Sequence, residues 1–160
     1  MTGLQATWLI SSVGLAPALI VLSVHDLRTH RLPDWLTLPL IPAGWLAAWL
    51  LERDLTLHVL GAAIGYGAFV LLELAYKALR GRAGLGRGDA KLLAAGGAWC
   101  GALALPVIVL IASASGLVCL LALHLLRLRP IRADQPVAFG PFLALAIACY
   151  WAGLSLVMLR

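Results

Sequence analysis

Carboxylates are the side chains in this sequence that are best suited to chemistry. Asp26 and Asp89, two of its seven acidic residues, each adjoin the end of a long apolar stretch. Asp89 also ends the segment GLGRGD, residues 84–89, whose glycines leave open backbone for an extended substrate to approach. Two carboxylates a few ångströms apart cannot both ionise cheaply, so such a pair shares one proton. One member can then activate water while the other protonates a leaving amine, as in aspartic proteases.

The positions of the two aspartates also suggest their roles. Asp89 is expected at a helix N-terminus, where the helix dipole favours an anion, and Asp26 at a helix C-terminus, where it disfavours one. Asp89 would then start as the base and Asp26 as the acid, although nearby arginines could reverse this order. Simpler roles stay open as well: Asp89 as a helix N-cap, and Asp26 paired with Arg28 or Arg31.

The other acidic residues are weaker candidates. Glu73 lies four residues before Lys77, so a salt bridge within one helix and a carboxylate that lines a cavity are both open. The remaining acids in predicted loops are expected to be solvated charges: Glu52, Asp54 and Asp134.

Neither a metal nor a cofactor is expected. The three cysteines lie inside apolar stretches without a CxxC pair, as small apolar fillers do: Cys100, Cys119 and Cys149. No HExxH occurs, and the four histidines lack further ligands at metal spacing: His25, His30, His58 and His124. No Ser–His or Ser–Lys pair stands out as a competing catalytic set.

The elements that hold these residues must lie in a membrane. The 160 residues are 62% hydrophobic and only 12% charged, whereas about a quarter of the residues in an average soluble domain are charged. Helices are the default spanning element, because lipid offers backbone polar groups no other partner. We therefore predict one all-α domain over residues 1–160, with six transmembrane helices at roughly 6–25, 35–51, 58–79, 90–103, 105–126 and 139–159.

Basic residues set the expected orientation. Ten of the 12 Lys and Arg residues fall in or beside the predicted loops 26–34, 80–89 and 127–138. By the positive-inside rule these loops face the cytoplasm and both termini lie on the other side. Asp26 and Asp89 then share one face. The net charge of +5 mostly reflects this topology, and nucleic-acid binding explains it poorly. Three tryptophans near span ends are expected as interface anchors: Trp8, Trp35 and Trp49.

The fourth predicted span is unusually short. Its 14 residues, 90–103, would form about 21 Å of helix, while the hydrocarbon core is about 30 Å thick. If its outer end reaches the interface, Asp89 lies below the cytoplasmic surface of the membrane. Polar backbone at that depth is tolerated only where it lines a wet cavity or is buried in protein. A hydrated cavity around Asp89 is therefore expected.

Three stretches of the sequence match signatures of a known family. They are HDLRTHRLPDWLTLPL at residues 25–40, GLGRGDAKLLAAGGAWCG at 84–101 and AFGPFLALA at 138–146. Together they resemble the type IV prepilin peptidases, the GxGD intramembrane aspartyl proteases of peptidase family A24. In order and spacing, the resemblance runs through essentially the whole chain.

The resemblance implies an aspartic endopeptidase of the bacterial inner membrane. The family's catalytic aspartates fall on Asp26 and Asp89, and its GxGD glycines on Gly86 and Gly88. Lys91 and Glu73 are further candidates for supporting the substrate or the loop. Substrates of the family are prepilins and pseudopilins of pilus and type II secretion systems. They are cut after a Gly that ends a short basic leader, on the cytoplasmic side.

Other matching residues are expected to be structural supports: Leu32, Pro33, Asp34, Thr37 and Pro39, with Asp34 able to cap the second helix. The chain also departs from its relatives. Larger members carry a four-Cys zinc cluster associated with N-methylation of the pilin. This chain resembles a short form without it, so we expect no methyltransferase activity. Ala83 and Leu85 stand where many relatives have Glu and Met.

Other kinds of function also stay open. Intramembrane carboxylates occur in small transporters, and the chain could be a structural membrane subunit with non-catalytic aspartates. The sequence does not identify the prepilin, the secretion system or the oligomeric state.

Overall fold

A computed structural model describes residues 3–80, 86–126 and 138–158 of the chain. Within these ranges the protein is helical and has no strand, which confirms the predicted all-α class. The elements are α1 (Gly3–Thr29), α2 (Asp34–Leu50), α3 (Leu55–Arg80), α4 (Arg87–Cys100), the short 3₁₀ helix η1 (Ala102–Ala104), α5 (Leu105–Leu125) and α6 (Gly140–Met158).

Two helix boundaries differ from the prediction in ways that affect the aspartates. The first span was expected to end at residue 25, but α1 continues to Thr29, so Asp26 lies in its last turn. The fourth was expected to begin at residue 90, but α4 begins at Arg87, so Asp89 lies in its first turn. Both carboxylates are therefore held by helix rather than by loop, which fixes their backbone.

Three segments are long and apolar enough to cross a membrane by length and composition: Ile10–Thr29, Leu55–Leu79 and Ala102–Leu125. A shorter apolar helix covers Gly140–Leu154. The remaining two helices are also short, since α2 has 17 residues and α4 has 14. A membrane protein follows from these segments, and crossing by all six helices stays a prediction.

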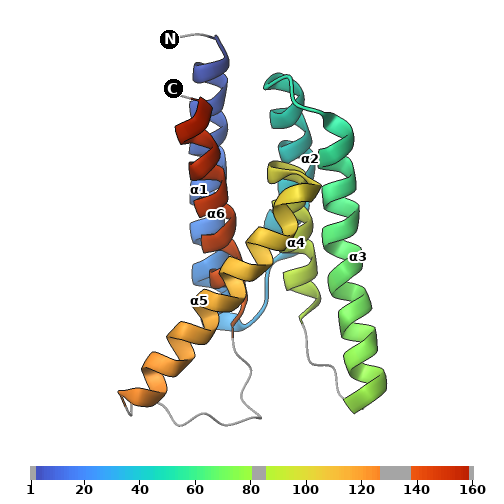
Figure 1. Ribbon diagram of the computed structural model, residues 1–160, viewed down its shortest axis with the longest axis vertical. Coiled ribbons are helices and arrows are strands. Elements are labelled where there is room, and N and C mark those ends of the chain that lie inside the picture. The colour runs from blue at the N-terminus through green and yellow to red at the C-terminus, as the bar shows by residue number, and fades with distance from the viewer. Residues whose placement is uncertain (1–2, 81–85, 127–137, 159–160) are drawn as a thin grey trace.

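The helices run alternately in opposite directions (Figure 1). The beginning of α1 and the end of α6 lie at one end of the molecule, while α1, α3 and α5 all run toward the opposite end. α5 crosses the bundle obliquely rather than parallel to its neighbours. This alternation brings the end of α1 and the beginning of α4 to the same half of the protein.

α4 is the central helix of the bundle. Ala90 and all residues of α4 from Leu92 to Cys100 are buried. Glycines let its neighbours approach closely: a Cβ added to Gly61 of α3 would lie 2.5 Å from the carbonyl oxygen of Gly97. Small residues at a helix contact allow such backbone approach in membrane proteins. α4 therefore packs against protein on its sides rather than against lipid.

Polar contacts fix the C-terminal half of α4. Trp99 donates its indole N–H to the carbonyl oxygen of Leu40 in α2 at 2.8 Å. His58 of α3 donates its Nδ1–H to the carbonyl oxygen of Ala98 at 2.9 Å. A buried indole or imidazole needs such a partner, and here each one ties a neighbouring helix to the α4 backbone.

Tryptophans also pack at the end of the molecule where α1 begins and α6 ends (Figure 1). Trp8 stacks on Trp151 with ring centroids 4.0 Å apart, and the guanidinium carbon of Arg53 lies 4.8 Å from the Trp8 centroid. Trp8 is buried, so its prediction as an interface anchor was wrong, whereas Trp35 and Trp49 are exposed as predicted. The stack attaches α1 to α6 at the end of the molecule away from the two aspartates.

Candidate active site

Asp26 and Asp89 line one cavity of about 680 Å³. Its wall also includes the segment after α1, parts of α3 and α5, and Ala138 and Phe139 before α6. Phe69 and Phe139 face each other in this wall with ring centroids 6.4 Å apart. The cavity thus has three carboxylates, those of Asp26, Asp34 and Asp89, and an apolar side, as a site for an extended peptide with apolar side chains would need.

Asp26 is almost completely buried, with 5% of its surface exposed. Its Oδ2 accepts a hydrogen bond from the backbone N–H of Gly140 at 3.0 Å. The alternative that Asp26 pairs with Arg28 or Arg31 is therefore wrong for the described residues. Gly140 begins α6, so Asp26 lies at the N-terminus of one helix as well as in the last turn of another. The helix-dipole argument for Asp26 as the acid no longer distinguishes the two aspartates.

The turn after Asp26 is closed by local hydrogen bonds. His30 has a left-handed φ of 51° and donates its N–H to the carbonyl oxygen of Asp26 at 2.8 Å. His25 Nδ1 and Thr29 Oγ1 both contact the carbonyl oxygen of Arg31, at 2.9 and 3.2 Å. A left-handed residue is a common helix C-terminus, and histidine adopts this region more readily than most residues. The chain therefore leaves α1 sharply and turns back toward α2 beside the cavity.

Asp89 occupies the third position of α4. The N-cap is Gly86, whose backbone is extended and which makes no side-chain capping bond, so the prediction of Asp89 as N-cap was wrong. The N–H of Asp89 donates to the carbonyl oxygen of Gly86 at 3.0 Å. Asp89 lines the same cavity as Asp26. Two carboxylates in one cavity cannot both ionise cheaply.

The two GxGD glycines serve different purposes. A Cβ added to Gly86 would lie 3.4 Å from Oδ2 of Asp89, an ordinary contact beside the carboxylate. A Cβ added to Gly88 would lie 2.9 Å from the Cβ of Leu32, closer than such atoms normally approach. Gly88 therefore lets the segment after α1 pack against the beginning of α4, which closes one side of the cavity.

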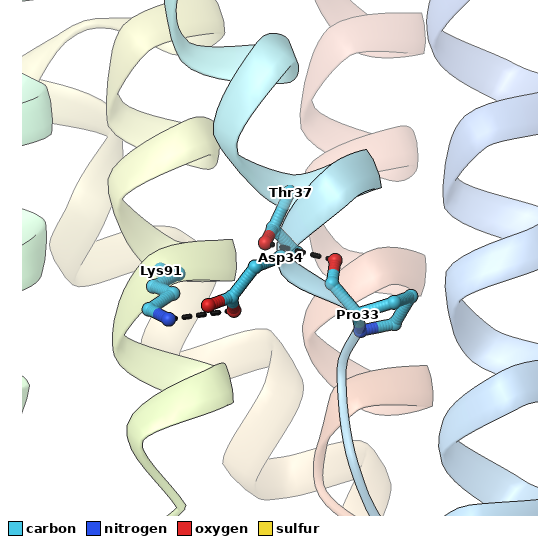
Figure 2. Close-up of polar contacts among 4 residues, drawn as sticks. All are labelled: Pro33, Asp34, Thr37 and Lys91. Atoms are coloured by element: carbon cyan, nitrogen blue, oxygen red, sulfur yellow. Dashed lines mark hydrogen bonds and ion pairs between the residues drawn. The ribbon is translucent and has the colours of Figure 1, made fainter.

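Lys91 and Glu73 make ion pairs at the beginning of α4. Lys91 Nζ lies 2.6 Å from Oδ1 of Asp34 on α2, and the two side chains point toward each other (Figure 2). Arg87 Nε lies 3.6 Å from Oε2 of Glu73 on α3, so Glu73 pairs with Arg87 and not with Lys77 among the described residues. Asp34 makes no capping bond, because the N-cap of α2 is Pro33, and the prediction of Asp34 as a cap was wrong.

These ion pairs compensate an unfavourable charge arrangement. Arg87 and Lys91 are four residues apart at a helix N-terminus, where the helix dipole and their mutual repulsion both disfavour cations. Their partners come from α3 and α2, so the first turn of α4 is attached to two neighbouring helices around Asp89. Lys91 and Glu73 thus contact other helices, and neither lines the cavity.

Sequence reasoning missed three residues of this site: Gly140, Phe69 and Phe139. The stretch AFGP was noticed as part of a family signature, but nothing in it indicated a hydrogen bond to Asp26. Other predictions concern residues outside those described: Ala83, Leu85, Asp134, Arg82, Arg127, Arg129, Arg132 and Arg160.

Fold and cavity together define a helical membrane protein in which Asp26 and Asp89, with Asp34, line one partly enclosed site. The model of the type IV leader peptidase family matches residues 13–121, which is more than half of the chain. The chain belongs to this family, and the resemblance seen in the sequence is confirmed.

Several bacterial proteins named prepilin leader peptidase/N-methyltransferase are similar to the chain. The protein of Burkholderia pseudomallei (strain 1026b) is 44% identical over 137 residues, which cover 84% of this chain and 43% of that protein. The protein of Dickeya chrysanthemi is 45% identical over 129 residues, covering 79% and 44%. That of Escherichia coli (strain K12) is 45% identical over 130 residues, covering 79% and 55%.

The chain spans about half the length of the curated relatives it matches. No solved structure matches it significantly. The family and the three apolar segments identify a bacterial membrane protein.

Proposed function

We propose that this chain is an intramembrane aspartic endopeptidase that removes the short basic leader from type IV prepilins or pseudopilins. The observation that carries this proposal is the shared cavity, in which Asp26 from α1 and Asp89 from α4 both take part. The names of the relatives support the same class of reaction. The apolar wall with Phe69 and Phe139 suits a peptide segment that enters from the membrane.

The proposed reaction uses the pair as a unit with one shared proton. The ionised carboxylate takes a proton from water, and the resulting hydroxide attacks the carbonyl carbon of the leader's last Gly. The protonated carboxyl group donates to the carbonyl oxygen, so a tetrahedral diol forms. When the C–N bond breaks, one carboxyl group protonates the leaving amine and the other takes back a proton from the diol. Two carboxylates that line one cavity cannot both ionise cheaply, which supports a pair that keeps one proton.

The proposed location is the bacterial inner membrane, with six spanning helices in a single domain. The odd-numbered loops face the cytoplasm, the termini face the periplasm, and the active site opens at the cytoplasmic face. The distribution of Lys and Arg supports this orientation, and a basic leader on the cytoplasmic side would reach the cavity without crossing the membrane. The burial of α4 supports its insertion despite its short length, because it meets protein rather than lipid.

A transporter is the weaker alternative. It would need polar side chains along a path through the bilayer. In the described residues of the outer half, α4 is surrounded by tight helix contacts, and the tryptophan stack closes the outer end. Glu52 and Asp54 lie in the loop between α2 and α3 at that end, whereas the carboxylates that line the cavity lie at the other end. This favours a site for chemistry over a route for transport.

Single replacements of the aspartates test the proposal. The protein, purified in detergent, is incubated with a prepilin, and leader release is followed by mass spectrometry. Asp26→Asn and Asp89→Asn should each abolish cleavage, because each removes one ionisable member of the pair. Asp54→Asn is the matched control: Asp54 is exposed, and an Asn oxygen can still accept the N–H of Thr56, which Asp54 Oδ1 accepts at 2.9 Å. Near-normal turnover in either active-site variant would refute the mechanism.

A further inference from the structure

We infer that the backbone N–H of Gly140 positions Asp26 for catalysis, and that the missing side chain at residue 140 leaves the space this carboxylate needs. The inference rests on the proposed function, which names Asp26 as a member of the catalytic pair. Gly140 acts through Asp26 and is therefore a positioning residue.

In the first turn of α6, one backbone N–H group is available to bind Asp26. The first N–H groups of a helix have no partner within the helix. Here Phe142 and Leu143 both donate to the carbonyl oxygen of Phe139 at 3.1 Å, and Pro141 has no N–H. The N–H of Gly140 is the remaining donor of this turn, and it points at Oδ2 of Asp26 at 3.0 Å. Both residues are buried, so water does not compete strongly for this bond.

This bond assigns separate tasks to the two oxygens of Asp26. The N–H of Gly140 occupies one of the two lone pairs of Oδ2, whereas no hydrogen bond from the described residues occupies Oδ1. We therefore expect Oδ1 to exchange a proton with water or with Asp89. Without the bond, the carboxylate could rotate about its terminal torsion, which has a broad energy profile. The N–H therefore fixes which oxygen faces the reaction.

Only glycine leaves room for this arrangement. A Cβ added at residue 140 would lie 2.6 Å from Oδ2 of Asp26 and 3.0 Å from its Cγ, whereas ordinary contact begins at 3.4 Å. The carboxylate or the beginning of α6 would have to move by about 0.8 Å. Gly153, further along the same helix, has nothing within 4 Å of an added Cβ and provides a matched control.

Charged groups around Asp26 determine what a pH profile can report. Its own helix contributes His25, the turn after it His30 and Arg31, and the beginnings of α2 and α4 contribute Asp34, Arg87 and Asp89. The described cavity residues of α3, α5 and the segment before α6 carry no ionisable side chain. A replacement at residue 140 changes none of these groups directly, so a changed profile would report a displaced Asp26.

The first test compares Gly140→Ala with Gly153→Ala in the prepilin assay. We expect the kcat of Gly140→Ala to fall by about 100-fold, since misplacing a catalytic group by about 1 Å has an effect of this size. The KM should stay within about twofold, the pH–rate profile should shift, and Gly153→Ala should match the wild type. A kcat of Gly140→Ala near that of the wild type would overturn the inference. A fall in kcat/KM that leaves the pH–rate profile unchanged would also overturn it.

The second test does not depend on activity. In a chain with its three cysteines replaced by Ala, Asp26→Cys is combined with either Gly140→Cys or Gly153→Cys. A Cβ at residue 140 would lie 3.3 Å from that of Asp26, close to the separation of about 3.5–4.5 Å in disulfides. Oxidation should cross-link the first pair and not the second. Absence of the first cross-link would overturn the inference, whereas a wild-type chain that cuts no prepilin would instead refute the proposed function.

Discussion

The contact between α3 and α4 at Gly61 gives the sharpest test of how the bundle positions Asp89. In Gly61→Ala the new Cβ would lie 2.5 Å from the oxygen of Gly97, 2.8 Å from the nitrogen of Ala102 and 2.9 Å from the carbonyl carbon of Gly101. All three are backbone atoms, so no side-chain rotation relieves the overlap. Ordinary contact begins at 3.4 Å, and the two helices would have to separate by about 0.9 Å.

Both stability and activity should respond to this separation. Overpacking of this kind typically lowers the free energy of unfolding by about 1–3 kcal/mol. The indole bond from Trp99 to Leu40 holds the outer half of α4 on α2, so part of the displacement must reach the end of α4 that carries Asp89. A shift of about 1 Å at a catalytic group lowers kcat by about 100-fold, so we expect a fall of about 10- to 100-fold.

Gly67, in the same helix, provides the control, because nothing lies within 4 Å of a Cβ added there. Gly67→Ala should keep full activity and gain about 0.5–1 kcal/mol, since alanine is the better helix residue. Unfolding in detergent can be followed by the intrinsic fluorescence of the six tryptophans, and activity by leader release. The reasoning is refuted if Gly61→Ala unfolds at the same denaturant concentration as Gly67→Ala.

Two further predictions concern the ion pair of Lys91 and methyl transfer. A double-mutant cycle on Lys91 and Asp34 should give a coupling of only about 0.2–1 kcal/mol, because the Asp34 side chain is 59% exposed; a value above about 2 kcal/mol would contradict this. The purified 160-residue chain, supplied with S-adenosylmethionine, should leave the new N-terminus of a cleaved pilin unmethylated; an added methyl mass would show otherwise.

The features that could be predicted from the sequence are those that depend on a local pattern of residues. Apolar runs located all six helices, and the alternation of their directions was enough to expect Asp26 and Asp89 on one side. Prediction from the sequence failed where a contact joins segments that are far apart in the sequence. Glu73 has Lys77 at helical spacing, yet it pairs with Arg87 from another helix. The bond from Gly140 to Asp26 joins the two ends of the chain, and no local rule predicts it.

Capping was mispredicted for a different reason. Asp89 and Asp34 are residue types that favour N-caps, but caps are decided by where the backbone changes conformation. At both helices the extended residue is an earlier one, Gly86 with a ψ of 129° and Pro33 with a ψ of 130°. Both acids therefore fall inside the first turn of their helices, where their side chains are available for contacts with other elements. Asp89 lines the cavity together with Asp26, and Asp34 binds Lys91.

The short length of α4 follows from its position in the bundle. A helix of 14 residues is too short to match a hydrocarbon core of about 30 Å, but this mismatch matters only where helix ends meet lipid. α2, α3 and α6 surround α4, and glycines at its contacts with α3 bring the backbones together. Its beginning can therefore stop inside the protein, where a carboxylate and non-helical backbone line a cavity rather than lipid. Residues inserted into α4 after Asp89 would carry this carboxylate away from Asp26, so the short helix and the shared cavity are two consequences of the same packing.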